Sequence, residues 1–79
     1  MTKTTLAKAI KAIRAKQGLS GRQLARLSGL KPETLSNIEQ AKANPRLSTL
    51  EAIAFTLGVE VKELFTELKH DLVNKDENL

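Results

Sequence analysis

Apolar residues recur at intervals of three and four along most of this 79-residue chain, and the pattern is broken at short intervals. The breaks are Gly18, Gly29, the pair Asn44-Pro45, and Gly58. Intervals of three and four place side chains on one face of an α-helix, whereas glycine and proline end helices. No stretch alternates apolar and polar residues for long, as a half-buried strand does. The sequence therefore predicts an all-α fold of five short helices.

These breaks set the bounds of the predicted helices. The first runs from about Thr5 to Gln17, the second follows Ser20 and stops at Gly29, the third spans about Pro32 to Gln40, the fourth begins near Ser48 and stops at Gly58, and the fifth continues from Val61 to about Leu72. The residues expected to face the core in the first four are Leu6, Ala9, Ile10, Ile13, Leu24, Ala25, Leu27, Leu35, Ile38, Leu50, Ile53, Ala54 and Leu57. Residues 1–72 are predicted to form one domain, followed by a flexible polar tail, 73–79.

The composition limits the classes of function. The chain has no cysteine, so disulfides and cysteine-based zinc sites are excluded, and a reducing cytoplasm is the expected location. It has one histidine, His70, no phosphate-binding glycine loop and no cluster of metal ligands, so neither an enzyme nor a cofactor is predicted. No apolar run approaches the roughly 18 residues that a membrane-spanning helix needs.

Charge is divided unevenly along the chain. Residues 1–46 contain ten Lys and Arg against two Glu, a net charge of +8, whereas residues 47–79 contain three Lys against seven acids, a net charge of −4. A basic half of this kind indicates a polyanionic partner, either nucleic acid or a membrane surface, although two solvated charged faces would give the same counts. The acidic half is expected to repel phosphate, or to bind a basic protein such as a toxin or a polymerase subunit.

The junction between the second and third predicted helices carries the most specific pattern. Ser20 and Gln23 have the spacing of a capping box, and Gly29 ends one helix shortly before a proline begins the next. Two helices joined this closely cross steeply, as in a helix-turn-helix. Residues 19–39, LSGRQLARLSGLKPETLSNIE, resemble the Cro/CI-type helix-turn-helix family, and the wider match covers residues 5–66. The resemblance implies a compact, five-helix, lambda-repressor-like domain that binds double-stranded DNA.

The resemblance also implies roles for the exposed residues of the third helix, whose first turns lie in the major groove of DNA in such repressors. The expected base-reading residues are Lys31, Glu33, Thr34, Ser36, Asn37 and Gln40. Asn37 can pair with an adenine edge, and Glu33 can either accept from cytosine or stabilise the helix start. Pro32 departs from the family pattern, because a proline replaces a long polar side chain there.

Residues on either side of the third helix are expected to contact the DNA backbone, although a solvated basic loop is the alternative for those after it. This set is Arg22, Gln23, Lys42, Asn44 and Arg46. Gly21 stands where related proteins often carry a glutamine that touches phosphate, so this contact would pass to Arg22 or to backbone amides. The resemblance further implies a partly buried ion pair between Arg14 and Glu39, holding the third helix against the first.

Phe55 is predicted to lie on the solvent side of the fourth helix, and an exposed aromatic side chain suggests a partner surface. A two-fold dimer contact is expected from Phe55, Val61, Phe65 and Leu68, unless the segment around Leu72 folds back over Phe55. The predicted function is a homodimeric repressor or small controller protein acting at a palindromic operator. The alternative is an antitoxin that binds a toxin through its C-terminal half and regulates its own operon.

Overall fold

The computed structural model describes residues 3–65. These residues form four α-helices and one 3₁₀-helix, namely α1 (Lys3–Lys16), α2 (Gly21–Leu27), α3 (Pro32–Glu39), α4 (Leu47–Leu57) and η1 (Val61–Phe65). No strand occurs within residues 3–65, and the prediction of an all-α fold is confirmed. The first helix begins two residues before its predicted start, and the fourth begins one residue before.

The prediction of a fifth α-helix from Val61 to Leu72 is not confirmed. Val61–Phe65 is a 3₁₀-helix, and the amide of Glu63 at its start donates to the carbonyl of Glu60 at 2.9 Å, a bond between residues three apart. The Glu63 carboxylate in turn accepts from the Glu60 amide at 2.9 Å, which favours this tighter turn. Residues 66–72 of the predicted helix, with Leu68 and Leu72, lie outside the described residues, as do His70 and the predicted tail, 73–79.

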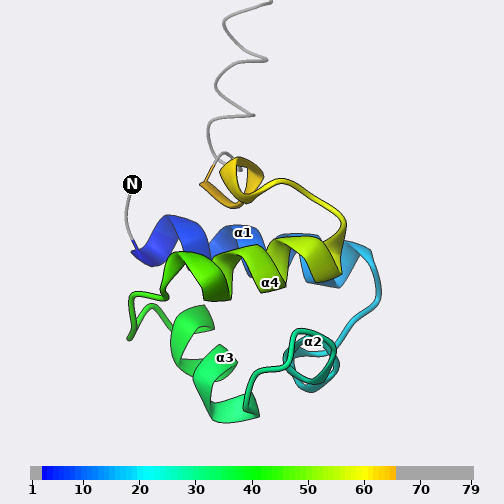
Figure 1. The fold of residues 1–79 in the computed structure, drawn as a ribbon, viewed down its shortest axis with the longest axis horizontal. Coiled ribbons are helices and arrows are strands. Elements are labelled where there is room, and N and C mark those ends of the chain that lie inside the picture. The colour runs from blue at the N-terminus through cyan, green and yellow to red at the C-terminus, as the bar shows by residue number, and fades with distance from the viewer. Residues whose placement is uncertain (1–2, 66–79) are drawn as a thin grey trace, which may run out of the picture.

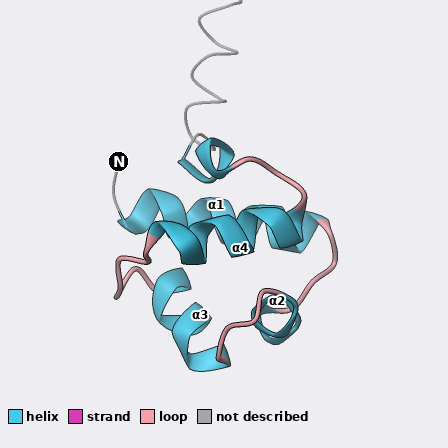
Figure 2. Ribbon diagram, in the orientation of Figure 1, coloured by secondary structure: helices cyan, strands magenta, loops and turns pink. Residues whose placement is uncertain are grey.

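The five elements form a closed ring around one core. α1 contacts α3 and η1, α3 contacts α2, α2 contacts α4, and α4 contacts η1, which completes the ring. Figures 1 and 2 show η1 on one side of the α1 and α4 helices, with α2 and α3 on the opposite side. The α2–α3 pair therefore forms one end of the molecule.

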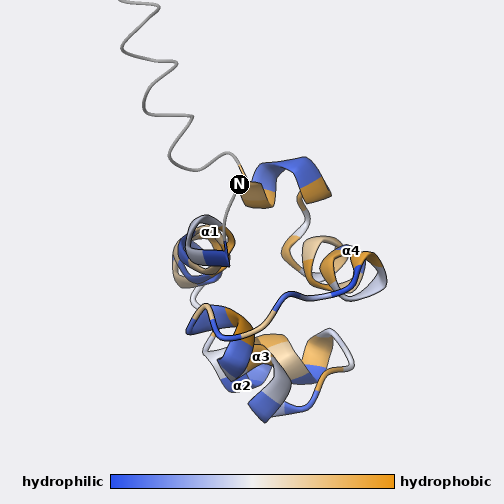
Figure 3. Cartoon of the chain, turned by 90° about the vertical axis from the view of Figure 1, so that its left-hand side faces the viewer, coloured by the Kyte–Doolittle hydropathy of each residue, from blue (hydrophilic) through white to orange (hydrophobic). Residues whose placement is uncertain are grey.

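Every element of the ring contributes buried apolar side chains to the core. They are Leu6 and Ile10 of α1, Leu24 and Ala25 of α2, Leu35 and Ile38 of α3, Leu50, Ile53, Ala54 and Leu57 of α4, and Leu64 of η1. In Figure 3 the hydrophobic colour is most continuous along α4, whereas the loop that leads into this helix is largely hydrophilic. The buried residues of α4 are Leu50, Ile53, Ala54 and Leu57.

One core prediction is wrong, because Leu27 is 59% exposed. It is the last residue of α2, beside polar contacts that this end of the helix makes with α4. The Ser28 hydroxyl donates to the Thr56 hydroxyl at 3.1 Å, and the Thr56 hydroxyl lies 3.4 Å from the Leu27 carbonyl oxygen. The Leu27 side chain itself lies outside the core.

The turns that position α2 and α3 depend on local chemistry. The Ser20 hydroxyl accepts from the Gln23 amide at 3.1 Å, and the Gln23 side chain accepts from the Ser20 amide at 2.8 Å. This capping box confirms the prediction from their spacing. After α2, Gly29 adopts a φ of +74°, a left-handed conformation that a Cβ would disfavour.

Helix α3 ends on an alanine in the conformation that glycine usually takes. Ala41 has a φ of 61°, and its amide donates to the Ile38 carbonyl at 3.1 Å. The next amide, of Lys42, donates to the Asn37 carbonyl at 2.9 Å, which completes a Schellman motif. The motif turns the chain sharply away from α3 into the loop that precedes α4.

Candidate nucleic-acid interface

The exposed side of α3 presents polar side chains because its other side is anchored in the core. Leu35 and Ile38 are almost fully buried, at 1% and 2% exposure. Among the six residues predicted to read bases, Lys31, Glu33, Thr34, Ser36 and Gln40 are exposed and Asn37 is half-buried. The structure thus brings all six together on the solvent side of one helix and its two ends.

Two of these six residues interact with each other. The side-chain nitrogen Nε2 of Gln40 donates to the Ser36 hydroxyl at 2.7 Å, across one turn of helix. The Ser36 oxygen therefore already accepts one hydrogen bond, while its own hydrogen stays available to a further acceptor. Only the spacing of four residues in the sequence hints at this pairing.

Basic and polar residues lie at both ends of α3. Arg22 of α2 lines a hollow with Pro32, at the start of the helix, and is exposed. Lys42, Asn44 and Arg46 are exposed in the loop that follows the helix. Gln23 is also exposed, but its side-chain oxygen is engaged in the capping box, which leaves its amide hydrogens for a ligand.

An ion pair fixes the far end of α3 to α1. The guanidinium of Arg14 donates from Nε and Nη2 to the two carboxylate oxygens of Glu39, at 2.8 and 2.9 Å. Its Nη1 donates to the Leu19 carbonyl at 3.1 Å, just before α2 begins. The side chains of Arg14 and Glu39 are 21% and 10% exposed. One guanidinium therefore connects α1, the start of α2 and the end of α3.

The same contact keeps Arg14 charged. The hydrogen bond to Glu39 raises the pKa of Arg14, against a smaller lowering from burial. A raised pKa in the folded state stabilises the protein below the ordinary pKa of arginine, and this contribution is lost only above the raised value. Arg14 consequently stays positively charged throughout the physiological pH range.

Sequence reasoning missed the polar contacts that join distant segments. The side-chain nitrogen of Gln17 donates to the Leu57 carbonyl at 2.6 Å, so the end of α1 is tied to the end of α4. Thr56, whose hydroxyl also donates to the Ala52 carbonyl at 2.9 Å, joins α4 to α2. Neither contact could be predicted from the spacing of residues in the sequence, because the partners lie 40 and about 28 residues apart.

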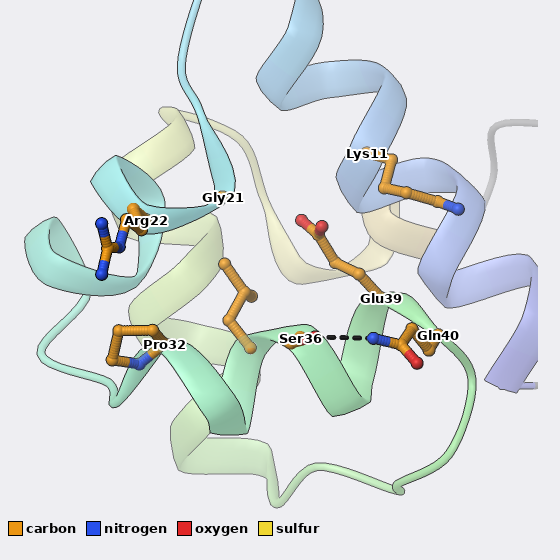
Figure 4. Close-up of a pocket in the computed structure, with 8 residues that line it drawn as sticks. Lys11, Gly21, Arg22, Pro32, Ser36, Glu39 and Gln40 are labelled. Carbon is orange, nitrogen blue, oxygen red and sulfur yellow. Dashed lines mark hydrogen bonds between the residues drawn. The ribbon is translucent and has the colours of Figure 1, made fainter.

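Two further basic residues, which were not predicted as site residues, line hollows beside α3. Lys11 of α1 lines a hollow of about 340 Å³ with Arg22, Ser36 and Gln40 (Figure 4). Arg26 of α2 lines a second hollow, of about 350 Å³, with Arg22. Both belong to the basic half of the sequence, but their place beside α3 depends on how the helices cross.

The predicted dimer residues are divided in the structure. Phe55 is 87% exposed on α4, whereas Val61 and Phe65 of η1 are half-buried and pack against the core. Leu68 lies outside the described residues. Among the predicted dimer residues that the structure describes, Phe55 is therefore the most exposed to solvent.

The described part of the chain lacks two other kinds of site. Residues 3–65 contain no group of three or more His, Cys, Asp and Glu placed to hold a metal ion. No helix in this part of the chain has the length and apolar character needed to cross a membrane.

Known proteins share this arrangement. A family model described as Helix-turn-helix matches residues 10–64. The transcriptional regulator PuuR of Escherichia coli is 43% identical over 60 residues, which cover 76% of this chain and 32% of PuuR. The immunity repressor protein of Bacillus phage phi105 is 43% identical over 63 residues, which cover 80% of this chain and 44% of the repressor. The chain thus spans less than half of the length of either relative.

A solved structure of similar size shows the same fold. The restriction-modification controller protein C.AhdI of Aeromonas hydrophila superposes with a TM-score of 0.77 at 30% identity, over 80% of this chain and 96% of C.AhdI. The match to the family model includes the α2–α3 junction and covers more than half of the 79 residues. The chain therefore belongs to the helix-turn-helix family.

Proposed function

We propose that this protein is a sequence-specific transcriptional regulator, a homodimeric repressor or small controller protein that acts at a palindromic operator in the cytoplasm. The observation that carries the proposal is the exposed polar face of α3, which lies between basic residues at both of its ends. Because Leu35 and Ile38 hold the opposite face in the core, this face is available to the major groove. A groove about 12 Å wide admits one α-helix.

Base reading is assigned to the first two turns of α3. Asn37 is matched to adenine, because the oxygen of a carboxamide can accept from the N6 amino group while its NH₂ group donates to N7. Glu33 is matched to the N4 donor of cytosine, and the Thr34 methyl group to a thymine methyl. Lys31 can donate to guanine or to a phosphate.

Backbone contacts are assigned to the residues that flank α3. Arg22 at one end and Lys42 and Arg46 at the other are exposed cations, so each can neutralise a phosphate and release counterions. These contacts set the register of the duplex and carry no sequence information of their own. Asn44 and the free amide hydrogens of Gln23 add neutral donors to the same set.

Phe55 carries the homodimer part of the proposal. An aromatic side chain that is 87% exposed gains most when a second surface covers it. A two-fold contact through α4, with the exposed parts of Val61 and Phe65, would place two α3 helices about 34 Å apart along one face of DNA. Sedimentation at micromolar concentration tests this part, and a strict monomer with and without DNA would contradict it.

Selection from a library of genomic DNA fragments tests the function as a whole. The full chain is expected to enrich one motif with two-fold symmetry, and Asn37→Ala is expected to enrich a motif altered at one position in each half-site. Arg46→Ala serves as the matched control, because it should weaken all sites alike and reduce the salt dependence. The proposal fails if no motif is enriched and all duplexes bind equally at every salt concentration.

A further inference from the structure

The hollow of about 350 Å³ between α2 and the start of α3 is lined by two kinds of side chain. Arg22 and Arg26 of α2 are charged, whereas Leu30 and Pro32, in the turn and at the start of α3, are apolar. In Figure 4 the Arg22 side chain lies above Pro32. Among the residues that the structure describes, no acidic side chain lines this hollow. It therefore offers two positive charges beside an apolar surface.

The two arginines lie on one face of α2, and their charges are not compensated within residues 3–65. They are four residues apart in a continuous helix, which places their Cβ atoms about 6 Å apart. Both are exposed, and neither forms an ion pair or a side-chain hydrogen bond with another residue in 3–65. Like charges at this spacing destabilise a helix slightly, so the stability of α2 does not account for the pair.

The apolar side chains of the hollow are held in place by the turn between α2 and α3. The Leu30 amide donates to the Ala25 carbonyl at 2.8 Å, and the half-buried Leu30 side chain packs against the core. Pro32 is exposed, and its ring fixes the backbone at the first position of α3. A ligand can consequently make apolar contacts here without the entropy cost of ordering flexible side chains.

We propose that this hollow binds an acidic segment of a partner protein, with two carboxylates on Arg22 and Arg26 and an apolar side chain on Leu30 and Pro32. The planar guanidinium group pairs with a carboxylate through two parallel hydrogen bonds. Acidic residues four apart in a helix, or two apart in a strand, have the required spacing. A phosphate would satisfy the arginines alone, whereas an acidic protein segment satisfies both kinds of lining residue.

This surface goes beyond the proposed function and does not depend on it. Arg26 has no part in the proposed contacts with DNA, whereas Arg22 is assigned to a phosphate of the duplex. The acidic segment and the duplex would therefore compete for Arg22. For this reason Arg26 is the residue to substitute, and the partner surface is best tested in the absence of DNA.

Selection of peptides from a random phage-displayed library on the immobilised full chain tests the inference. The enriched peptides are expected to share two acidic residues at one of these spacings, with an apolar residue beside them. A selected peptide labelled with fluorescein then gives affinities by fluorescence anisotropy. Arg26→Gln should weaken its binding by about fivefold or more, and Arg26→Lys, which keeps the charge but loses the planar group, should weaken it less.

Lys16→Gln is the control for net charge. Lys16 is an exposed cation at the end of α1 that does not line this hollow, so its loss should leave the affinity for the peptide unchanged. Replacement of the apolar residue of the peptide by alanine should weaken binding, which a purely ionic contact would not show. Equal melting temperatures of the variants and the wild type are the check that the fold is intact.

The inference is overturned if no peptide is enriched, or if the enriched peptides are not acidic. It is overturned equally if Arg26→Gln and Lys16→Gln weaken a selected peptide to the same extent, since the attraction would then follow net charge alone. In either case, weaker binding of Arg26→Gln to a scrambled duplex would assign the hollow to the DNA backbone. Enrichment of acidic peptides without any enriched DNA motif would refute the proposed function and leave this inference standing.

Discussion

Removal of the Glu39 carboxylate is expected to cost more stability than any exposed substitution in this chain. Glu39→Ala eliminates two charged hydrogen bonds, of 2.8 and 2.9 Å, and strands a guanidinium that is only 21% exposed. Breaking a buried pair by removing one partner costs about 3–5 kcal/mol, and the partial exposure of Arg14 places this case near 3 kcal/mol. For a domain of this size, that loss lowers the melting temperature by roughly 12–24 °C.

Thermal and urea denaturation followed by circular dichroism measure the effect. Glu51→Ala, an exposed glutamate on α4, is the control and should change stability by no more than about 0.5 kcal/mol. The double substitution of Arg14→Met with Glu39→Leu removes both charges and should recover much of the loss, because no charge remains stranded. The reasoning is refuted if Glu39→Ala melts within about 2 °C of the wild type. It is refuted equally if the double variant is less stable than Glu39→Ala.

Three further predictions concern single side chains. Ala41→Gly should raise stability by up to about 1 kcal/mol in thermal melts, because relief of a left-handed alanine exceeds the added chain entropy of glycine; a lower melting temperature would contradict this. Gln17→Ala should lower stability by about 1 kcal/mol through loss of the bond to the Leu57 carbonyl, with operator affinity unchanged at 20 °C when measured by fluorescence anisotropy. Phe55→Glu should leave the melting temperature of the monomer unchanged, because the side chain is 87% exposed, and should abolish the dimer in sedimentation; a persistent dimer would exclude Phe55 from the interface.

Features that depend on neighbouring residues were predictable from the sequence. The capping box of Ser20 and Gln23 is a contact across three residues, and the left-handed turn at Gly29 follows from the missing Cβ. The buried positions Leu35 and Ile38 follow from helical periodicity, which places them on one side of α3. Local chemistry and spacing are sufficient for each of these.

Features that depend on how helices cross were not predictable in this way. Leu27 has the periodicity of a core residue, but α4 meets the end of α2 through Thr56 and leaves Leu27 exposed. Lys11 is separated by 25 residues from Ser36, and only the packing of α1 on α3 brings both to one hollow. Sequence reasoning placed Ser36 and Gln40 on the correct side of α3, but it could not show that they are bonded to each other.

The closed ring of five elements has a consequence for how the domain folds. The ring is completed only when α1 meets η1, although these elements stand at opposite ends of the described chain. The segment that contains α2 and α3 has no core of its own, because Leu35 and Ile38 share one buried cluster with residues of α1, α4 and η1. Short isolated helices are marginal in water, so an excised α2–α3 fragment should not hold its crossing angle. The exposed face of α3 is therefore a property of the whole cooperative unit, and it is lost in a single transition when that unit unfolds.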